Sequence, residues 1–153
     1  MRIRNMMHKS LAVIGPDVDF AALLAAYRQM ESRLVYVVDK DGKLLGVISS
    51  YDILRVMFPF YLDSNLVKAL PDDESVLRQA FSACKGQPAA DIMTTDFAAV
   101  TPDALFLEAE ALIAERGVNV LPVVDDKGRL VGEVSRRAIL KYLAERCGLE
   151  DEA

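Results

Sequence analysis

The 153-residue sequence has no tryptophan, a single histidine and two cysteines. With one imidazole, His8, the chain cannot assemble a cluster of cysteine and histidine metal ligands, and a catalytic triad would need His8 itself. We expect His8 to be a surface side chain. Cys84 and Cys147 belong to no Cys-x-x-Cys pair, so two reduced thiols are expected. Without a nucleophile–base pair, a metal-ligand set or a phosphate-binding glycine loop, an enzyme is not expected.

Positive charge is also scarce, because 18 lysines and arginines face 23 acidic residues and the formal net charge is −5. Nucleic-acid and anionic-membrane surfaces both reward a basic face, so neither partner is expected. The sequence has no apolar run of transmembrane length and no signal peptide. These features predict a cytoplasmic location. An apolar fraction of 52% is enough for a core in one domain or in two small ones.

The sequence contains an internal repeat. Gly46 and Gly132 are 132 − 46 = 86 positions apart, and a shift of 86 aligns residues 6–57 with 92–143 without a gap. Coinciding pairs include Met7 with Met93, Pro16-Asp17 with Pro102-Asp103, Phe20 with Phe106, and Val37-Val38-Asp39 with Val123-Val124-Asp125. The matches cluster where backbone geometry or core packing is demanding. The repeat therefore predicts one supersecondary unit used twice.

Each copy is predicted to run strand, helix, strand, strand, helix. Short apolar runs at 11–14 and 97–100 predict the first strands, and Asp17 and Asp103 are candidate N-caps of the helices that follow. The continuously apolar runs 34–38 and 120–124 predict strands covered on both faces.

A glycine-containing hairpin turn follows each of these strands, at 39–42 and 125–128. The returning strands are predicted at 43–48 and 129–134. Pro122 cannot donate a hydrogen bond, so its strand is expected to be unpaired there or to lie at an edge. Between the copies, Pro71-Asp72-Asp73-Glu74 predicts the start of an amphipathic helix in an insert at 58–88.

The segment from Gly46 to Asp52 joins a strand to a helix. Ser49-x-x-Asp52 is first of all the pattern of a capping box, which needs no ligand. Gly46, however, lets a backbone or a ligand approach the strand closely. A helix N-terminus also suits a phosphate, and a carboxylate one turn on suits the hydroxyls of a ribose. Capping and ribonucleotide binding both stay open on these grounds.

At this point the chain resembles a known family. The helix openings at Pro-Asp, the run Leu121-Pro122-Val123-Val124-Asp125, Gly128, Leu130-Val131-Gly132 and the final Ser-x-x-Asp helix start resemble the cystathionine-β-synthase (CBS) domain. The resemblance implies an α/β (α+β) fold of two β-α-β-β-α repeats packed about a pseudo-twofold axis, with a helical insert between them. It places the first repeat at 6–57, the insert at 58–88 and the second repeat at 89–147.

What the resemblance implies about function is ligand sensing. CBS pairs bind AMP, ADP, ATP or S-adenosylmethionine in clefts between the repeats, as regulatory ligands and not as covalent cofactors. Carried over, Ser49 would meet the phosphates and Asp52 the ribose hydroxyls. The other expected ligand-binding residues surround the base: Ile14, Val35, Tyr36, Gly46 and Val47. A homodimer and an effector protein in trans are further expectations.

The second copy departs from this pattern. Ala138 stands where the first copy has the expected ribose-binding acid, which should cost a charge-assisted pair of about 1.5–3 kcal/mol. A weaker site there would use Ser135, Arg136, Arg137, Val120 and Pro122. The two arginines could reach a phosphate or could be solvated, and Glu133 would repel an anion or place a carboxylate against the base. The alternative for the whole chain is a ligand-free dimerisation or interaction scaffold, in which Ser49 and Asp52 only cap a helix.

Overall fold

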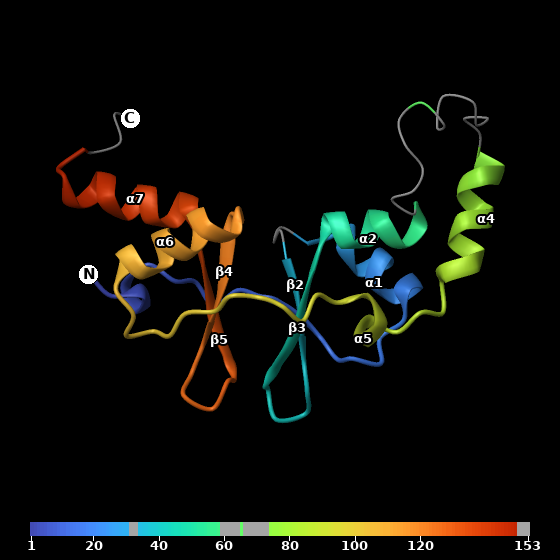
Figure 1. The fold of residues 1–153 in the computed structure, drawn as a ribbon, viewed down its shortest axis with the longest axis horizontal. Coiled ribbons are helices and arrows are strands. Elements are labelled where there is room, and N and C mark those ends of the chain that lie inside the picture. Colours follow the sequence, from blue (N-terminus) through green and yellow to red (C-terminus); the bar gives the residue numbers. More distant parts are fainter. Residues whose placement is uncertain (31–33, 59–64, 66–73, 150–153) are drawn as a thin grey trace. The chain divides into compact units, whose positions relative to one another are not determined.

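A computed structural model describes residues 1–30, 34–58, 65 and 74–149 (Figure 1). The chain forms two compact units, each built from interleaved segments. The Asp52 unit comprises Ala12–Val37 and Leu45–Thr95, and the Ala138 unit comprises Met1–Leu11, Val38–Leu44 and Asp96–Ala153. Each unit is described separately below. The fold is mixed α+β, as predicted.

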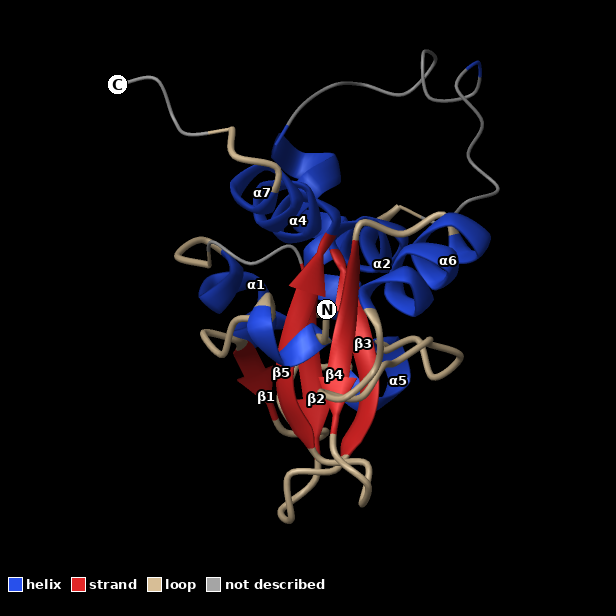
Figure 2. Ribbon diagram, turned by 90° about the vertical axis from the view of Figure 1, so that its left-hand side faces the viewer, coloured by secondary structure: helices blue, strands red, loops and turns tan. Residues whose placement is uncertain are grey.

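The Asp52 unit is built on a three-stranded sheet of order β1-β2-β3 (Figure 2). The strands are β1 (Ala12–Ile14), β2 (Leu34–Val38) and β3 (Leu44–Ser49), and β1 runs parallel to β2. Val35, Tyr36 and Val37 have no exposed surface, which confirms that β2 is covered on both faces. The helices are α1 (Phe20–Tyr27), α2 (Ser50–Met57), α4 (Glu74–Cys84) and the short α5 (Ala89–Ile92).

The Ala138 unit carries the antiparallel pair β4 (Val120–Val124) and β5 (Leu130–Ser135). Its helices are the 3-10 turn η1 (Ile3–Asn5), α6 (Phe106–Arg116) and α7 (Arg136–Arg146). Ile3, Leu121, Val123 and Val134 form the centre of its core and are at most 1% exposed. Gly117 ends α6 in the left-handed conformation, at φ 63°, as a C-terminal glycine should.

Both hairpin turns form where the sequence predicts them. Gly42 and Gly128 take φ values of 84° and 78°, which L side chains rarely adopt. Asp125 Oδ1 accepts hydrogen bonds from the amides of Lys127 and Arg129, both at 2.9 Å. The amide of Arg129, above all, holds the pKa of Asp125 below its ordinary value. Such a turn is specified by local residues alone, which is why it could be read from the sequence.

The predicted strand at 97–100 is wrong. There only Val100 pairs, in an isolated parallel bridge with Val123. The carbonyl of Pro122 accepts from the Val100 amide at 3.1 Å, so the proline nitrogen faces the same segment. Because that nitrogen carries no hydrogen, the ladder present between β1 and β2 cannot extend here. The opposite side of Pro122 stays in register with Glu133 of β5.

Two predicted N-caps are also wrong. Asp19, not Asp17, caps α1 by accepting from the Ala22 amide at 2.8 Å. The second copy's helix α6 begins after Leu105 with no side-chain cap, and Asp103 instead pairs with Arg4. In both cases the Pro-Asp pair forms a turn ahead of the helix, so the predicted cap lay two residues too early.

The insert contains the predicted amphipathic helix, α4, whereas its predicted start at Pro71–Asp73 lies outside the described residues. Cys84 is buried and Phe81 packs against the core of the Asp52 unit, but Leu77 of the same helix is 49% exposed. Both cysteines are free thiols, and burial raises the pKa of Cys84. Within the described ranges, no helix has the length and apolar character needed to cross a membrane.

A segment exchange links the two copies. Residues 1–11 precede the first copy's sheet but pack in the Ala138 unit, where the Ile3 amide donates to the Ala104 carbonyl at 2.9 Å. Residues 89–95 precede the second copy's sheet but pack in the Asp52 unit, where the Ala89 amide donates to the Val18 carbonyl at 2.7 Å. Ile3 and Ala89 are 86 positions apart, so equivalent segments are exchanged. Each unit is completed by a segment that leads into the other copy.

Candidate functional site

The candidate site begins at the N-terminus of α2, where β3 ends. Ser49 is the N-cap, and the capping box is complete. The Asp52 amide donates to Ser49 Oγ at 3.2 Å, and the Ser49 amide donates to Asp52 Oδ2 at 2.9 Å. The structural reading of Ser49-x-x-Asp52 is thus confirmed. It leaves open whether the same carboxylate also meets a ligand, because a carboxylate can accept several hydrogen bonds.

Asp52 is a buried carboxylate with three kinds of partner. Its residue is 6% exposed, and besides Ser49 it contacts Arg55 and Thr94. Arg55 Nη2 lies 2.5 Å from Oδ1, and Thr94 Oγ1 lies 3.3 and 3.4 Å from the two oxygens. Burying a carboxylate is costly unless it is paired and hydrogen-bonded. These donors offset the cost of burying Asp52, at the start of a helix whose dipole also favours negative charge.

Thr94 reaches Asp52 because the exchanged segment is fixed to β3. The amides and carbonyls of Val47 and Thr94 exchange two hydrogen bonds, at 3.0 and 2.8 Å. Next to this bridge, Met93 fills the space above Gly46. A Cβ on Gly46 would lie 2.6 Å from the Met93 sulfur and 2.9 Å from its Cβ. The close approach predicted for Gly46 is therefore made by a methionine of the same chain.

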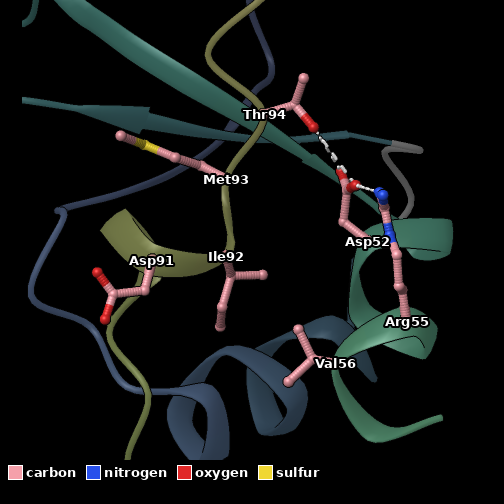
Figure 3. Close-up of a pocket in the computed structure, with 7 residues that line it drawn as sticks. All are labelled: Asp52, Arg55, Val56, Asp91, Ile92, Met93 and Thr94. Carbon is pink, nitrogen blue, oxygen red and sulfur yellow. Dashed lines mark hydrogen bonds and ion pairs between the residues drawn. The ribbon is translucent and has the colours of Figure 1, made fainter. Parts of the chain in front are cut away.

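A cavity of about 300 Å³ opens beside Asp52 (Figure 3). This volume is at the lower end of the range for small-molecule sites. The cavity is formed by α2 and by the exchanged segment, and its lining residues are Asp52, Arg55, Val56, Asp91, Ile92, Met93 and Thr94. Figure 3 shows the Asp52, Arg55 and Thr94 side chains converging, while the Asp91 carboxylate points away from them.

Of the seven ligand-binding residues predicted in the first copy, Asp52 lines this cavity. Ser49 is half-buried and engaged in the cap, and Gly46 is covered by Met93. The remaining four residues divide by burial: Val35 and Tyr36 have no exposed surface, whereas Ile14 and Val47 are partly exposed. The ligand contacts assigned to all seven residues stay predictions.

The equivalent place in the Ala138 unit is chemically different. Ser135 caps α7 by accepting from the Ala138 amide at 3.0 Å. Because Ala138 stands at the repeat position of Asp52, this cap has no reciprocal carboxylate. Glu133 is 4% exposed, and its Oε1 lies 2.8 Å from Nε2 of His8, whose side chain is 48% exposed. The backbone of His8 bridges Glu133 as Thr94 bridges Val47. His8 occupies the repeat position of Thr94. The second copy therefore has a contact between His8 and Glu133 where the first copy has the contact between Thr94 and Asp52.

The other residues predicted for a second site differ in exposure, and Val120 pairs with Ser135 in the β4–β5 ladder. Arg136 and Arg137 are exposed on the first turn of α7, and within the described ranges neither forms an ion pair. Val120 is partly exposed and Pro122 is buried in β4. This arrangement favours the solvated reading of the two arginines. A weak site at these residues stays a prediction.

Sequence reasoning missed the partners of Asp52, namely Arg55 and Thr94. Arg55 follows Asp52 by three residues, so the helical repeat could have placed it beside the acid. Thr94 follows Met93, the repeat partner of Met7, but its contact with Asp52 spans 42 positions. Only the exchange of segments between the copies brings Thr94 there. A local motif carries no signal for such an exchange.

Comparison with known proteins identifies the family to which the chain belongs. A family model described as CBS domain matches residues 3–59 and 89–145. Uncharacterized protein MJ1426 of Methanocaldococcus jannaschii is 30% identical over 155 residues, a match that covers 94% of this chain and 91% of the relative.

Two solved structures show the same fold. CBSX2 in complex with AMP, a protein of Arabidopsis thaliana, matches 95% of this chain and 98% of its own, with a TM-score of 0.73 and 23% identity. The CBS domain pair of MJ0100, in complex with 5-methylthioadenosine and S-adenosyl-L-methionine, matches 94% and 99%, with a TM-score of 0.68 and 18% identity. Together with the two matches of the family model, they show that the chain is a tandem pair of CBS domains and belongs to the CBS domain family.

Proposed function

We propose that the chain is a regulatory module that binds an adenosine-containing ligand, AMP, ADP, ATP or S-adenosylmethionine, at the cavity beside Asp52. The observation that carries the proposal is a buried carboxylate on the wall of a small-molecule-sized cavity, at the N-terminus of a helix. Such a carboxylate can accept hydrogen bonds from the two adjacent hydroxyls of a ribose. The complexes of CBSX2 with AMP and of MJ0100 with S-adenosyl-L-methionine support this ligand class.

Within this proposal Asp52 holds the ribose, and Ser49 lies where α2 presents its free amides to a phosphate. Ile14, Val35, Tyr36, Gly46 and Val47 are retained as the predicted surroundings of the base. The module regulates another protein through ligand occupancy and catalyses nothing itself. The cytoplasmic location belongs to the same proposal.

Ligand-dependent thermal stabilisation tests the proposal. AMP, ADP, ATP, S-adenosylmethionine and NADH are each added at about 100 times an assumed 10 μM Kd. Linkage then adds about 2.7 kcal/mol to the free energy of unfolding. For a chain of this length the melting temperature should rise by roughly 5–10 °C. The Asp52→Ala variant should show no such rise.

Asp19→Ala is the matched control, because it also removes a helix-capping carboxylate in the same unit but lies off the cavity. It should lose about 1 kcal/mol of stability and keep the ligand response. No response of the wild type to any of the five compounds would contradict the proposal. A response that survives Asp52→Ala would move the site elsewhere.

The complete capping box favours a second candidate, a ligand-free homodimerisation scaffold. Leu54 on α2 and Leu140 on α7 are 58% and 64% exposed, and they occupy the same position in the two copies. A twofold interface between two copies of this chain uses the same surface of each copy. Exposed leucines at equivalent positions of the repeat suit such an interface.

Sedimentation of the Leu54→Glu/Leu140→Glu variant tests this candidate, with a dimeric wild type expected to become monomeric. Leu107→Glu is the control, because Leu107 is also 64% exposed but has an alanine, Ala21, at its repeat position. A monomeric wild type, or a dimer unchanged by the double substitution, would contradict the interface.

A further inference from the structure

Arg55 is the charged side chain that can change position beside Asp52. Its side chain is 45% exposed, its Nη2 contacts Asp52 Oδ1, and it lines the cavity. The guanidinium also lies over the Tyr51 ring, 4.8 Å from its centroid. Tyr51 is itself 64% exposed, so this stacking takes place at the surface and does not lock the arginine.

The acceptor capacity of Asp52 is already used. Oδ2 accepts from the Ser49 amide at 2.9 Å and from the Ser49 hydroxyl at 3.1 Å, while Oδ1 accepts from Arg55. The Thr94 hydroxyl lies within 3.4 Å of both oxygens. A carboxylate offers about four lone-pair positions. A ribose that hydrogen-bonds to Asp52 must therefore replace a donor that is already there.

Arg55 is the donor that can be replaced. The Ser49 amide and hydroxyl oxygen are both fixed by the capping box at the start of α2, and Thr94 is held by two backbone hydrogen bonds to Val47. Arg55 has a long, half-exposed side chain on the second turn of the helix, so a change of rotamer moves its guanidinium without moving backbone. Once displaced, a guanidinium needs a new anion to recover a strong contact, and phosphate matches its fork of donors.

We propose that Arg55 determines ligand specificity: it leaves Asp52 when ribose binds and pairs with the ligand's phosphate. The site then selects phosphate-bearing adenosine compounds over neutral or cationic ones. This inference rests on the proposed function and deepens it, because it names the charge class of the ligand.

The charges around the cavity agree with this selection. Among the residues that the structure describes, three charged side chains line it: Asp52, Arg55 and Asp91. Asp91 lies on the exchanged segment and points away from Asp52 (Figure 3). Because Asp91 repels an anion and Arg55 attracts one, the phosphate of the ligand is expected on the Arg55 side of the cavity. Arg55 would otherwise keep its contact with Asp52 against a neutral ligand, and a cationic sulfonium would meet the displaced guanidinium as a like charge.

The repeat offers an internal comparison. Position 55 corresponds to Lys141, an exposed residue of α7, and position 52 corresponds to Ala138. The second copy thus keeps a cation on the second turn of the helix without an acid three residues before it. Of these two cations, only Arg55 can leave Asp52 and pair with a phosphate instead.

Isothermal titration with AMP, adenosine and S-adenosylmethionine tests the inference. The wild type should bind AMP about 10–100 times more tightly than adenosine, the range expected for one charge-assisted contact. In Arg55→Gln, AMP binding should weaken by this factor while adenosine binding stays equal or tightens, since Asp52 is no longer occupied. Arg55→Lys keeps the charge and should retain part of the preference. Arg78→Gln, on an exposed arginine of α4 outside the cavity, should change neither affinity.

The opposite changes in AMP and adenosine affinity separate a specificity residue from a merely structural one. Equal weakening of both compounds in Arg55→Gln and Arg55→Lys would overturn the inference, as would an unchanged ratio in Arg55→Gln or tighter binding of S-adenosylmethionine than of AMP by the wild type. Binding of AMP and adenosine with equal affinity would overturn it and leave the proposed function standing. If neither AMP nor adenosine nor S-adenosylmethionine binds the wild type, the proposed function fails and this inference with it.

Discussion

Replacing Ile3 with alanine should destabilise β4 and β5, although Val120 lies 120 − 3 = 117 positions further along the chain. Ile3 has no exposed surface and belongs to the core of the Ala138 unit. Truncating a buried isoleucine to alanine costs about 2–5 kcal/mol, because apolar contact is lost and a cavity remains. Hydrogen exchange should show this loss in the amides of β4 and β5, and little loss in those of β1 and β2.

Ile92→Ala is the mirror-image control. Ile92 is 8% exposed and belongs to the core of the Asp52 unit, although it directly precedes the second copy's sheet. Its removal should lower protection in β1 and β2 and spare β4 and β5. If each substitution instead destabilised the copy nearest in the sequence, the exchange of segments would be disproved.

Phe20→Ala should have the largest effect on global stability among the single substitutions considered. Phe20 is fully buried at the start of α1, and its ring centroid lies 6.4 Å from that of Phe81. Loss of a buried phenylalanine costs about 3–5 kcal/mol. At about 2–4 °C per kcal/mol for a chain of this length, calorimetry should record a fall in Tm of roughly 6–20 °C.

Phe106→Ala measures the same position of the repeat in the other unit. Phe106 is only partly buried and packs at the edge of its core cluster, so its loss should cost clearly less. Equal falls in Tm for the two variants would contradict the burial difference. That outcome would mean that the position in the repeat, and not the burial of the side chain, determines the loss of stability.

The parts of the fold that could be predicted are those that neighbouring residues decide. The turns at Gly42 and Gly128 and the capping box at Ser49 depend on residues a few positions apart. The repeat itself could be recognised because its two copies align without a gap. Asp17 failed as a cap because a nearby acid, Asp19, stands next to the first helical residue.

The parts that could not be predicted depend on segments distant in the sequence. The strand at 97–100 was lost to the missing N–H of Pro122, a residue of a different strand. The same distance hid Thr94 from the Asp52 motif, and it hid Met93 as the group that occupies the space over Gly46. The glycine predicted a close approach correctly, but a glycine does not say what approaches it.

The exchanged segments have a consequence for the order in which the protein can form during its synthesis. The ribosome releases Met1–Leu11 before the strands of either sheet, yet the core that Ile3 completes also needs residues of α6, β4 and β5. The Asp52 unit has all of its segments once Thr95 has emerged, so it can fold while the rest of the chain is still being made. Met1–Leu11 is therefore released before the Asp52 unit, but it can be buried only after α6, β4 and β5, which follow that unit, have emerged.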